Sequence, residues 1–238
     1  MFDDITKEII FTKRKKTISI SVEYKKIRVL APKYTSKKFI DTLIMKRKSW
    51  IEQKLEEKNT AITITQKQYI EGERFVFMGK DIYLSCVEKE GECVSYKCIN
   101  NIPYIEIAYP PHILPTDEEQ RIQYFHEKLL HWYKQQAYNI LKKQTLYYAD
   151  ILEVVPHEIN VKNYKARWGC CSTRNEVFYN WKIIMAPIEI IDYIVIHELC
   201  HILEHNHSNR FWGHVMRLDI DYKKHRAWLH KNGYTLNF

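Results

Sequence analysis

The chain has 238 residues, of which 45% are hydrophobic, and it carries a formal net charge of +8. This length supports one or two globular domains, and the 17 tyrosines and 6 tryptophans exclude the disordered class. No run of about 18 apolar residues is present, so the sequence predicts no membrane span. The start, MFDDITKEII, lacks the basic residues and apolar run of a secretory signal, and we expect a cytoplasmic protein.

The positive charge is concentrated in one segment near the N-terminus. Residues 10–58 contain 15 Lys and Arg against 5 Asp and Glu, whereas residues 59–238 contain 21 of each. Such a basic segment predicts an anionic partner, either nucleic acid or nucleotide, because it attracts phosphates. The alternative interpretation is an ordinary solvated surface of strand and helix.

The six cysteines are expected to be reduced thiols that fill packing positions, because no secretion signal accompanies them. Zinc ligation by Cys86, Cys93 and Cys98 is the weaker alternative, since no CxxC pair is present.

The first half of the chain is predicted to be rich in strands. Apolar residues alternate through Lys16–Pro32 with the period of a β-hairpin, and residues 35–58 then repeat them at helical spacing. Further strands are expected from Tyr69 to Tyr109. Residues 1–110 are therefore predicted to form a basic, β-rich N-terminal part.

The second half combines helices with a short sheet. Residues 114–152 are expected to form a long amphipathic helix with Thr116 as its N-cap, and strand alternation returns after residue 158. Pro187 then occupies the favoured first-turn position of a further helix, and two short helices complete the chain. We expect residues 111–238 to form a separate α+β core.

The helix after Pro187 carries the motif His197-Glu198-x-x-His201. Residues four apart lie on the same face of a helix, so the two imidazoles can point at one metal ion. Glu198 lies beside them, near enough to take a proton from a metal-bound water. The alternative, in which these are ordinary core or surface residues, must explain two histidines and a glutamate directly after the apolar run IDYIVI.

A catalytic zinc site usually has three protein ligands and leaves one position for water. On a continuous helix, His205 would lie two turns beyond His197, about 12 Å along the axis, which is too far to share an ion. The chain must therefore turn, and Asn206 tolerates the left-handed conformation that a turn requires. His207 follows the motif at the spacing of the HExxHxxGxxH pattern, although a glutamate here replaces the glycine. We predict His207 as third ligand, ahead of His205. Side chains that could ligate after the motif are Glu204, His205, His207 and His214.

Other polar residues around the motif have both a functional and a structural interpretation. Arg167, Trp168 and Gly169 precede the motif helix, and this strand edge could pair with an extended substrate, with Gly169 permitting close approach. Alternatively they form a structural corner. Asn180 could donate to an oxyanion or cap a turn, and Glu204 could orient a ligand histidine or face solvent.

Several segments in this order resemble the YgjP-like metallopeptidase family, also called DUF45, which is related to the SprT and WLM zinc proteases. They include RWGCCS, NWKIIMAP, HELCH and HNHSNRFW, and RKKTISISV, IRVLAP, KSWIEQKL and DYKKHRAWL fit the same family. The resemblance implies one Zn²⁺ per chain, held by His197, His201 and His207, with Glu198 as general base. It also implies a minigluzincin-like α+β core, in which a short sheet packs on the HExxH helix. The family usually has RWGSCS, and we expect Cys170, which replaces the first serine, to pack.

The leading hypothesis is a zinc-dependent peptidase that cleaves peptide or protein substrates. Three neutral imidazoles leave zinc its full charge, which lowers the pKa of bound water toward ~7, and Glu198 accepts the proton as that water attacks. One alternative is a metal-dependent pyrophosphatase of nucleoside triphosphates such as UTP, although no P-loop is present. Another is a DNA-associated binding protein with a structural zinc.

Overall fold

The computed structural model describes residues 6–14, 16–23, 26–63, 67–112 and 117–237. It divides into two compact units, Met1–Gln66 and Lys67–Phe238. The division falls before the strands between Tyr69 and Tyr109, and not near residue 110. These strands belong to the second unit because their buried residues share one hydrophobic core with the long helix that follows them.

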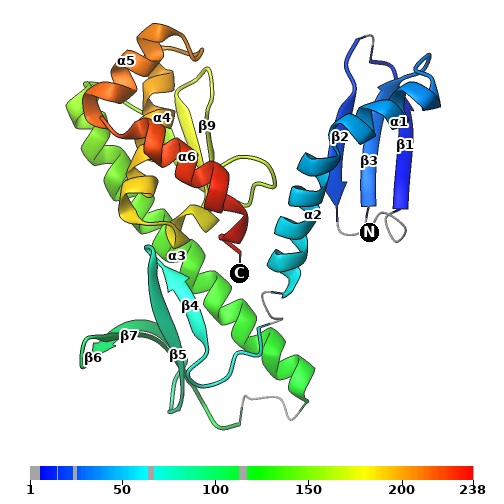
Figure 1. Ribbon diagram of the computed structural model, residues 1–238. Coiled ribbons are helices and arrows are strands. Elements are labelled where there is room, and N and C mark those ends of the chain that lie inside the picture. Colours follow the sequence, from blue (N-terminus) through cyan, green and yellow to red (C-terminus); the bar gives the residue numbers. More distant parts are fainter. Residues whose placement is uncertain (1–5, 15, 24–25, 64–66, 113–116, 238) are drawn as a thin grey trace. The chain divides into compact units, whose positions relative to one another are not determined.

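The first unit is a three-stranded sheet packed with two helices (Figure 1). The sheet order is β1-β3-β2, in which the antiparallel pair β2–β3 confirms the predicted hairpin. The strand β1, parallel to β3, was not predicted. Alternate residues of β3 are buried against the apolar faces of the helices. The elements are β1 (Thr6–Thr12), β2 (Ser19–Glu23), β3 (Lys26–Pro32), α1 (Lys37–Lys46) and α2 (Lys48–Thr63).

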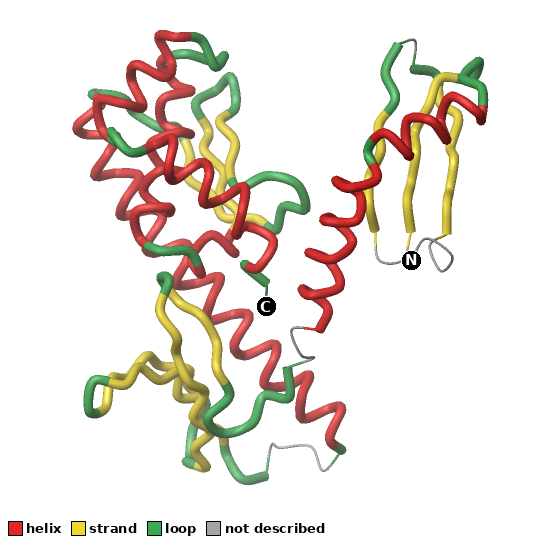
Figure 2. The backbone as a smooth tube through the Cα atoms, viewed as in Figure 1, coloured by secondary structure: helices red, strands yellow, loops and turns green. Residues whose placement is uncertain are grey.

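The second unit is built along α3 (Glu118–Leu152), with one sheet beside each half of this helix (Figures 1 and 2). The first sheet has the order β4-β5-β7-β6 and the second has the order β8-β10-β9. The strands of the first sheet are β4 (Arg74–Phe77), β5 (Lys80–Glu88), β6 (Cys93–Ile99) and β7 (Ile102–Tyr109). Those of the second are β8 (Glu158–Lys162), β9 (Gly169–Cys171) and β10 (Glu176–Asn180). The remaining elements are η1 (Trp181–Met185), α4 (Ile188–Leu203), α5 (Asn209–Leu218), α6 (Tyr222–Asn232) and η2 (Gly233–Thr235).

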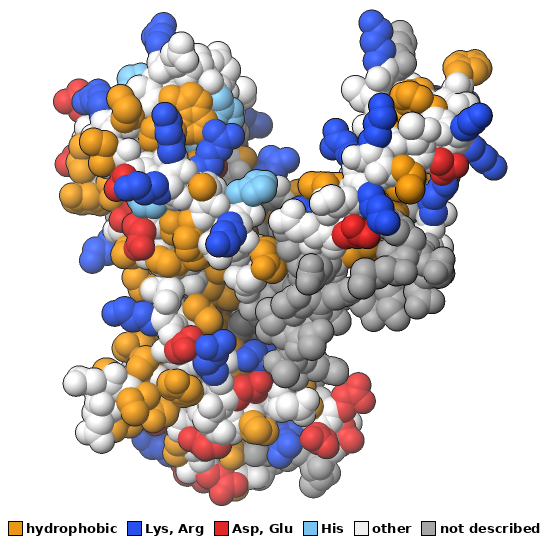
Figure 3. Space-filling view, viewed as in Figure 1, with side chains coloured by type: hydrophobic (Ala, Val, Ile, Leu, Met, Phe, Trp, Pro, Cys, Tyr) orange, Lys and Arg blue, Asp and Glu red, His pale blue; other side chains and the backbone are white. Residues whose placement is uncertain are grey.

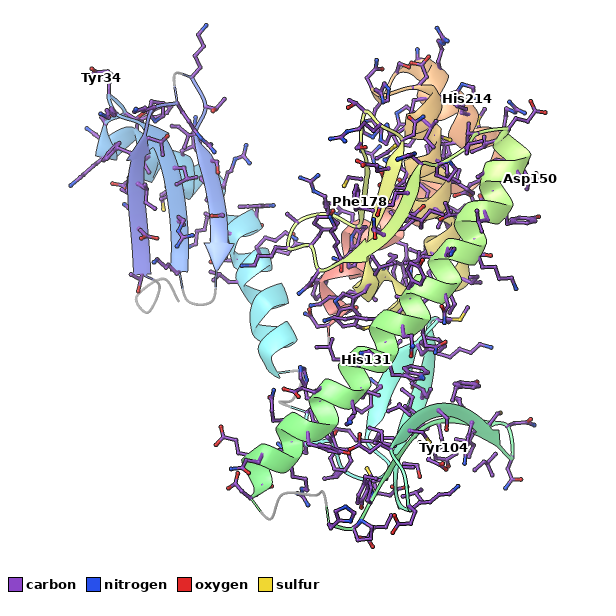
Figure 4. All side chains as sticks on the ribbon, turned by 180° about the vertical axis from the view of Figure 1, so that it is seen from behind. Tyr34, Tyr104, His131, Asp150, Phe178 and His214 are labelled. Atoms are coloured by element: carbon purple, nitrogen blue, oxygen red, sulfur yellow. The ribbon has the colours of Figure 1, made fainter. Side chains whose placement is uncertain are left out.

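The helix α3 is capped by its own sequence at both ends. The Asp117 carboxylate accepts the Gln120 N–H at 2.9 Å, so Asp117 is the N-cap, and the predicted cap Thr116 lies outside the described residues. At the other end Glu153 adopts φ 55° and stops the helix. His131 and Asp150, both labelled in Figure 4, are exposed and lie far apart along it. Its buried face packs against both sheets and α4, which makes the second unit a single α+β core.

The tip of the β4–β5 hairpin is fixed to the start of α4. Met78 and Gly79 adopt φ 50° and 73°, the left-handed pair of a tight hairpin turn. The N–H of Met78 donates to the Ile184 carbonyl at 2.8 Å, and that of Gly79 to the Met185 carbonyl at 3.1 Å. A Cβ on Gly79 would lie 2.8 Å from the Cα of Pro187, so only glycine fits there. The hairpin therefore holds η1 and the first turn of α4 in place.

Two expectations concern the whole chain. All six cysteines are free thiols, but the prediction that they fill packing positions is wrong for Cys93 and Cys98, which are exposed, and only Cys200 is buried. In the described ranges, no helix has both the length and the apolar character needed to cross a membrane.

Candidate metal centre

The HExxH motif occupies the last two turns of α4, a helix whose central turns are buried. Nine of its residues are buried, because apolar side chains occupy nearly every position before the motif. Pro187 stands at the N-cap of α4, one position before the first-turn position that the sequence predicted. Burial of the middle of the helix places the motif against a dry core, where a charge or a polar side chain interacts more strongly than in water.

Three histidines converge at the end of α4. Ligand nitrogens of His197, His201 and His207 all lie within 4.8 Å of one another, and the Nε2 atoms of His197 and His207 are 3.1 Å apart. Tetrahedral zinc with bonds of about 2.0–2.1 Å holds two ligand nitrogens about 3.3 Å apart, close to this separation. No other cluster of His, Cys, Asp or Glu with this spacing occurs in the part of the chain that the structure describes. The donor set therefore fits a zinc ion.

The chain reaches His207 by a turn that differs from the predicted one. The helix ends at Leu203, and Glu204 adopts an extended conformation with φ −142° and ψ 106°. Asn206 is not among the described residues with positive φ, so the predicted left-handed turn at Asn206 is wrong. Instead its side-chain oxygen accepts the Ser208 N–H at 3.0 Å, which closes an Asx turn ahead of α5.

The other candidate ligands lie outside the cluster. His205 is exposed, and His214, labelled in Figure 4, belongs to α5. The carboxylate of Glu204 forms an ion pair with Arg210 at 2.8 Å. However, the Glu204 carbonyl oxygen lies 3.1 Å from Nδ1 of His201. A carbonyl only accepts, so Nδ1 carries the proton and Nε2 keeps its lone pair. Glu204 thus orients a histidine through its backbone and not through its side chain.

Burial favours the neutral form of two of these imidazoles, those of His197 and His201. Burial, and then the neighbouring His201 and His207, lower the pKa of His197 to about 3, and burial likewise lowers the pKa of His201. The His197 ring packs against Tyr193 and Phe211, with centroid separations of 5.8 and 5.0 Å. Its Nδ1 is buried and has no hydrogen-bond partner among the described residues. A neutral imidazole has a free lone pair, which is the form that ligates metals.

Glu198 is buried against the backbone of β9. Its side chain is one of four buried polar or charged ones in the described residues, and the residue is 5% exposed. Burial raises the pKa of Glu198 to about 8, and the positive charge of Arg167 opposes that rise. A Cβ on Gly169 would lie 2.6 Å from both Cγ and Oε1 of Glu198. The close approach predicted for Gly169 is therefore made by the motif glutamate.

We expect Gly169→Ala to reduce the free energy of unfolding by roughly 1–3 kcal/mol, because the added methyl overpacks a buried site and displaces the Glu198 carboxylate. Gly213→Ala is the matched control, since nothing lies within 4 Å of a Cβ there and alanine favours the helix. Urea unfolding of both variants measures the difference. Equal stability of the two variants would mean that the space around Gly169 relaxes freely.

Asn180 organises the loop ahead of β9. Its Nδ2 donates to the carbonyls of Tyr164 at 2.9 Å and Arg167 at 3.3 Å, and its Oδ1 accepts the Lys182 N–H at 3.2 Å. Both amide hydrogens are therefore used within the protein, and the residue is 4% exposed. This geometry matches the capping interpretation of Asn180 and leaves no N–H for an oxyanion.

The segment around Arg167 leads into a free strand edge. A Cβ on Gly233 would lie 3.0 Å from the Trp168 ring, so Trp168 packs against the start of η2. Arg167 is exposed, with its guanidinium 5.7 Å from the centroid of the Tyr164 ring, and forms no ion pair with the residues that the structure describes. The strand β9 that follows is at the edge of its sheet. Its outer side has no strand partner in the described chain.

Two aromatic residues near the site were not predicted from the sequence to have a functional role. The Tyr164 hydroxyl lies 3.6 Å from Sγ of Cys170, the residue that departs from the family's serine. Trp212, on α5, is half-buried, and its ring stacks on His207 at 5.7 Å. By contrast Phe211 is fully buried. Periodicity alone could not have separated the two neighbours, because both face inward on α5 to different depths.

One comparison with known proteins, the match to a family profile, carries the assignment of this chain. Part of the chain is similar to the crystal structure of the metallopeptidase zymogen of Pyrococcus abyssi abylysin, with 20% identity and a TM-score of 0.35. That similarity covers 38% of this chain and 93% of abylysin, and it is too distant to bear on the site. No curated protein matches the chain. The sequence profile of the YgjP-like metallopeptidase domain matches residues 16–232. The chain therefore belongs to the YgjP-like metallopeptidase family.

Proposed function

We propose that the protein is a zinc-dependent peptidase that holds one Zn²⁺ per chain through His197, His201 and His207. The observation that carries this proposal is the convergence of three imidazoles beside the buried carboxylate of Glu198. We further propose that the α4 helix and the β8-β10-β9 sheet form a minigluzincin-like core, and that the protein acts in the cytoplasm.

The proposed reaction is hydrolysis of a peptide bond by water. A bound Zn²⁺ would supply a Lewis acid that polarises the scissile carbonyl and acidifies water. Glu198 takes the proton from the attacking water at its carboxylate and gives it to the nitrogen of the leaving amine. Burial raises the proton affinity of this carboxylate, and contact with the Gly169 backbone fixes its position. The carboxylate thus needs no reorientation between the two transfers.

The free edge of β9 gives the substrate a binding mode. An extended peptide can add to this edge as a further strand, with main-chain hydrogen bonds that do not depend on its sequence. Arg167 and Trp168 precede the edge, and Gly169 lies on it directly against Glu198. A peptide bound there would therefore pass beside the proposed general base.

The anionic partner of residues 10–58 stays a prediction. Part of the positive charge in this segment is already neutralised, since Lys26 and Arg28 form ion pairs with Glu8 at 2.9 and 2.8 Å. Lys15 lies outside the described residues. Basic side chains of the segment that are exposed include Lys13, Arg14 and Lys16.

The proposal is tested by removing and restoring the metal. We expect a chelator to abolish cleavage of a mixed peptide library, followed by mass spectrometry, and about one equivalent of zinc to restore it. Zinc should also raise the Tm of the chelated protein, because the three-histidine site exists only in the folded state. Cleavage that persists without metal, or stoichiometric zinc binding with no cleavage of any peptide, would contradict the proposal.

A further inference from the structure

A cationic pocket lies on the surface formed by α5 and α6. In the space-filling view, Lys and Arg side chains gather around a hydrophobic patch over these two helices (Figure 3). The pocket has a volume of about 520 Å³. Its lining residues are Trp212, Tyr222, Lys223, Arg226, Ala227 and His230.

The pocket is built from one face of α6. Lys223, Arg226, Ala227 and His230 are spaced so that they fall on the same side of a helix. Three of these four side chains have basic groups, and Ala227, the small one, leaves room between them. No acidic side chain lines the pocket. The surface is therefore shaped to receive a negatively charged group.

A stack of rings connects this pocket to the metal centre. The Trp212 ring stacks on His207 at 5.7 Å and on Tyr222 at 5.0 Å, with interplanar angles of 28° and 18°. The Arg226 guanidinium carbon lies 5.2 Å from the centroid of the same Trp212 ring. An extended peptide advances about 3.3 Å per residue. The pocket thus lies within a few substrate residues of the proposed ligand His207.

The positive charges of the pocket are not neutralised by the protein. Among the described residues, neither Lys223, Arg226 nor His230 forms an ion pair. The acids nearest in sequence are engaged elsewhere, since the Lys224–Asp221 ion pair and the hydrogen bond between His225 Nδ1 and Asp219 Oδ2 both measure 2.8 Å. Stacking on Trp212 also holds the Arg226 guanidinium in place while its N–H groups stay free to donate.

We propose that this pocket binds a carboxylate of the peptide substrate and makes the enzyme selective for acidic sequences near the cleaved bond. This proposal rests on the peptidase function proposed above. Arg226 and Lys223 donate to the carboxylate, and Trp212 forms the wall toward the metal centre. A carboxylate fits better than a triphosphate, because no glycine lines the pocket to expose a cradle of backbone N–H groups.

The test measures binding by fluorescence anisotropy, using zinc-loaded Glu198→Gln protein so that no peptide is consumed. The test compares pairs of labelled, C-terminally amidated decapeptides. The two peptides of a pair differ only by Glu or Gln at one of the four positions on either side of a central bond. We expect the best-placed Glu to tighten binding about fivefold, the upper range for an exposed charge pair. Arg226→Gln should remove this preference, so that the Glu and Gln peptides bind the variant equally. The matched control is Lys231→Gln, which removes an exposed charge of α6 outside the pocket and should keep the preference.

Neutral peptides with a free rather than an amidated C-terminus identify the source of the carboxylate. An Arg226-dependent preference for the free acid assigns the pocket to the chain terminus, and a preference for internal Glu assigns it to a side chain. If Glu and Gln peptides bind equally, and peptides with free and amidated C-termini also bind equally, the proposal of a carboxylate pocket is overturned. The proposed peptidase function would still stand in that case if the parent protein cleaves neutral peptides. Conversely, Arg226-dependent binding without cleavage of any peptide by the parent supports the pocket and overturns the function. Tighter Arg226-dependent binding of UTP or inorganic triphosphate than of any peptide overturns the carboxylate in favour of phosphate.

Discussion

Replacing Glu198 by Gln is expected to lower kcat for peptide hydrolysis by about 10²–10⁴-fold, the usual contribution of a general acid–base, while one zinc per chain remains bound. The amide has nearly the same volume as the carboxylate, so it fits against Gly169, but it cannot accept the proton of the attacking water. Steady-state kinetics and elemental analysis of the same preparation measure both effects. Loss of zinc together with activity would mean that Glu198 supports the metal instead of the proton transfer.

The same substitution should stabilise the metal-free chain at neutral and alkaline pH. Burial raises the pKa of Glu198 from its usual 4.5 to about 8, so ionisation of this carboxyl opposes folding. The cost is absent below about pH 4.5, where the carboxyl is protonated in both states, and it grows as pH rises toward 8. Urea unfolding at pH 5 and pH 8 should therefore show a larger advantage of the Glu198→Gln variant over the parent at pH 8. Glu189→Gln, on the exposed first turn of the same helix, is the control. It should show neither the stabilisation relative to the parent nor its growth between pH 5 and pH 8.

His207→Ala is expected to weaken zinc binding by more than about 100-fold, beyond what is typical for loss of a supporting residue. Two imidazoles on consecutive turns of α4 would remain, and two ligands do not hold zinc at a three-histidine site. Zinc content measured after gel filtration should fall from one per chain to near zero, and zinc should no longer raise the Tm.

His205→Ala is the matched control, because His205 is exposed and lies outside the cluster two residues away. This variant should keep one zinc per chain and its activity. If zinc were instead lost from His205→Ala and kept in His207→Ala, the loop after α4 would have to rearrange when the metal binds.

Local rules predicted which histidines lie together. The spacing of His197 and His201 follows from helix geometry, and the need for a turn before the third ligand led to His207. The form of that turn was not predictable, because Glu204 and Asn206 each have several conformations open to them and tertiary packing selects one. The contact between Gly169 and Glu198 joins a strand at the edge of a sheet to a helix. The spacing of apolar residues within one element cannot predict such a contact between two elements.

The fold shows the same limit at a larger scale. The hairpin β2–β3 and the helix α3 were predicted because each carries a strong period of its own. The strand β1 was missed because its burial is weak, with no fully buried residue. The strands between Tyr69 and Tyr109 were predicted, but they were assigned to the N-terminal part. In the structure they pack on α3 and belong to the second unit. The local sequence can identify a strand, but the structural unit to which the strand belongs depends on the hydrophobic core against which it packs.

The attachment of the β4–β5 hairpin to η1 and Pro187 also has a consequence for how the protein folds. These contacts join segments far apart in the sequence, so the entropy of closing a long loop must be overcome before the start of α4 is fixed. The three histidines lie beyond that point in the chain, at the end of α4 and in the loop after it. We therefore expect the docking of α4 on the β4–β5 hairpin to be a late step of folding, because it waits for this long-range closure.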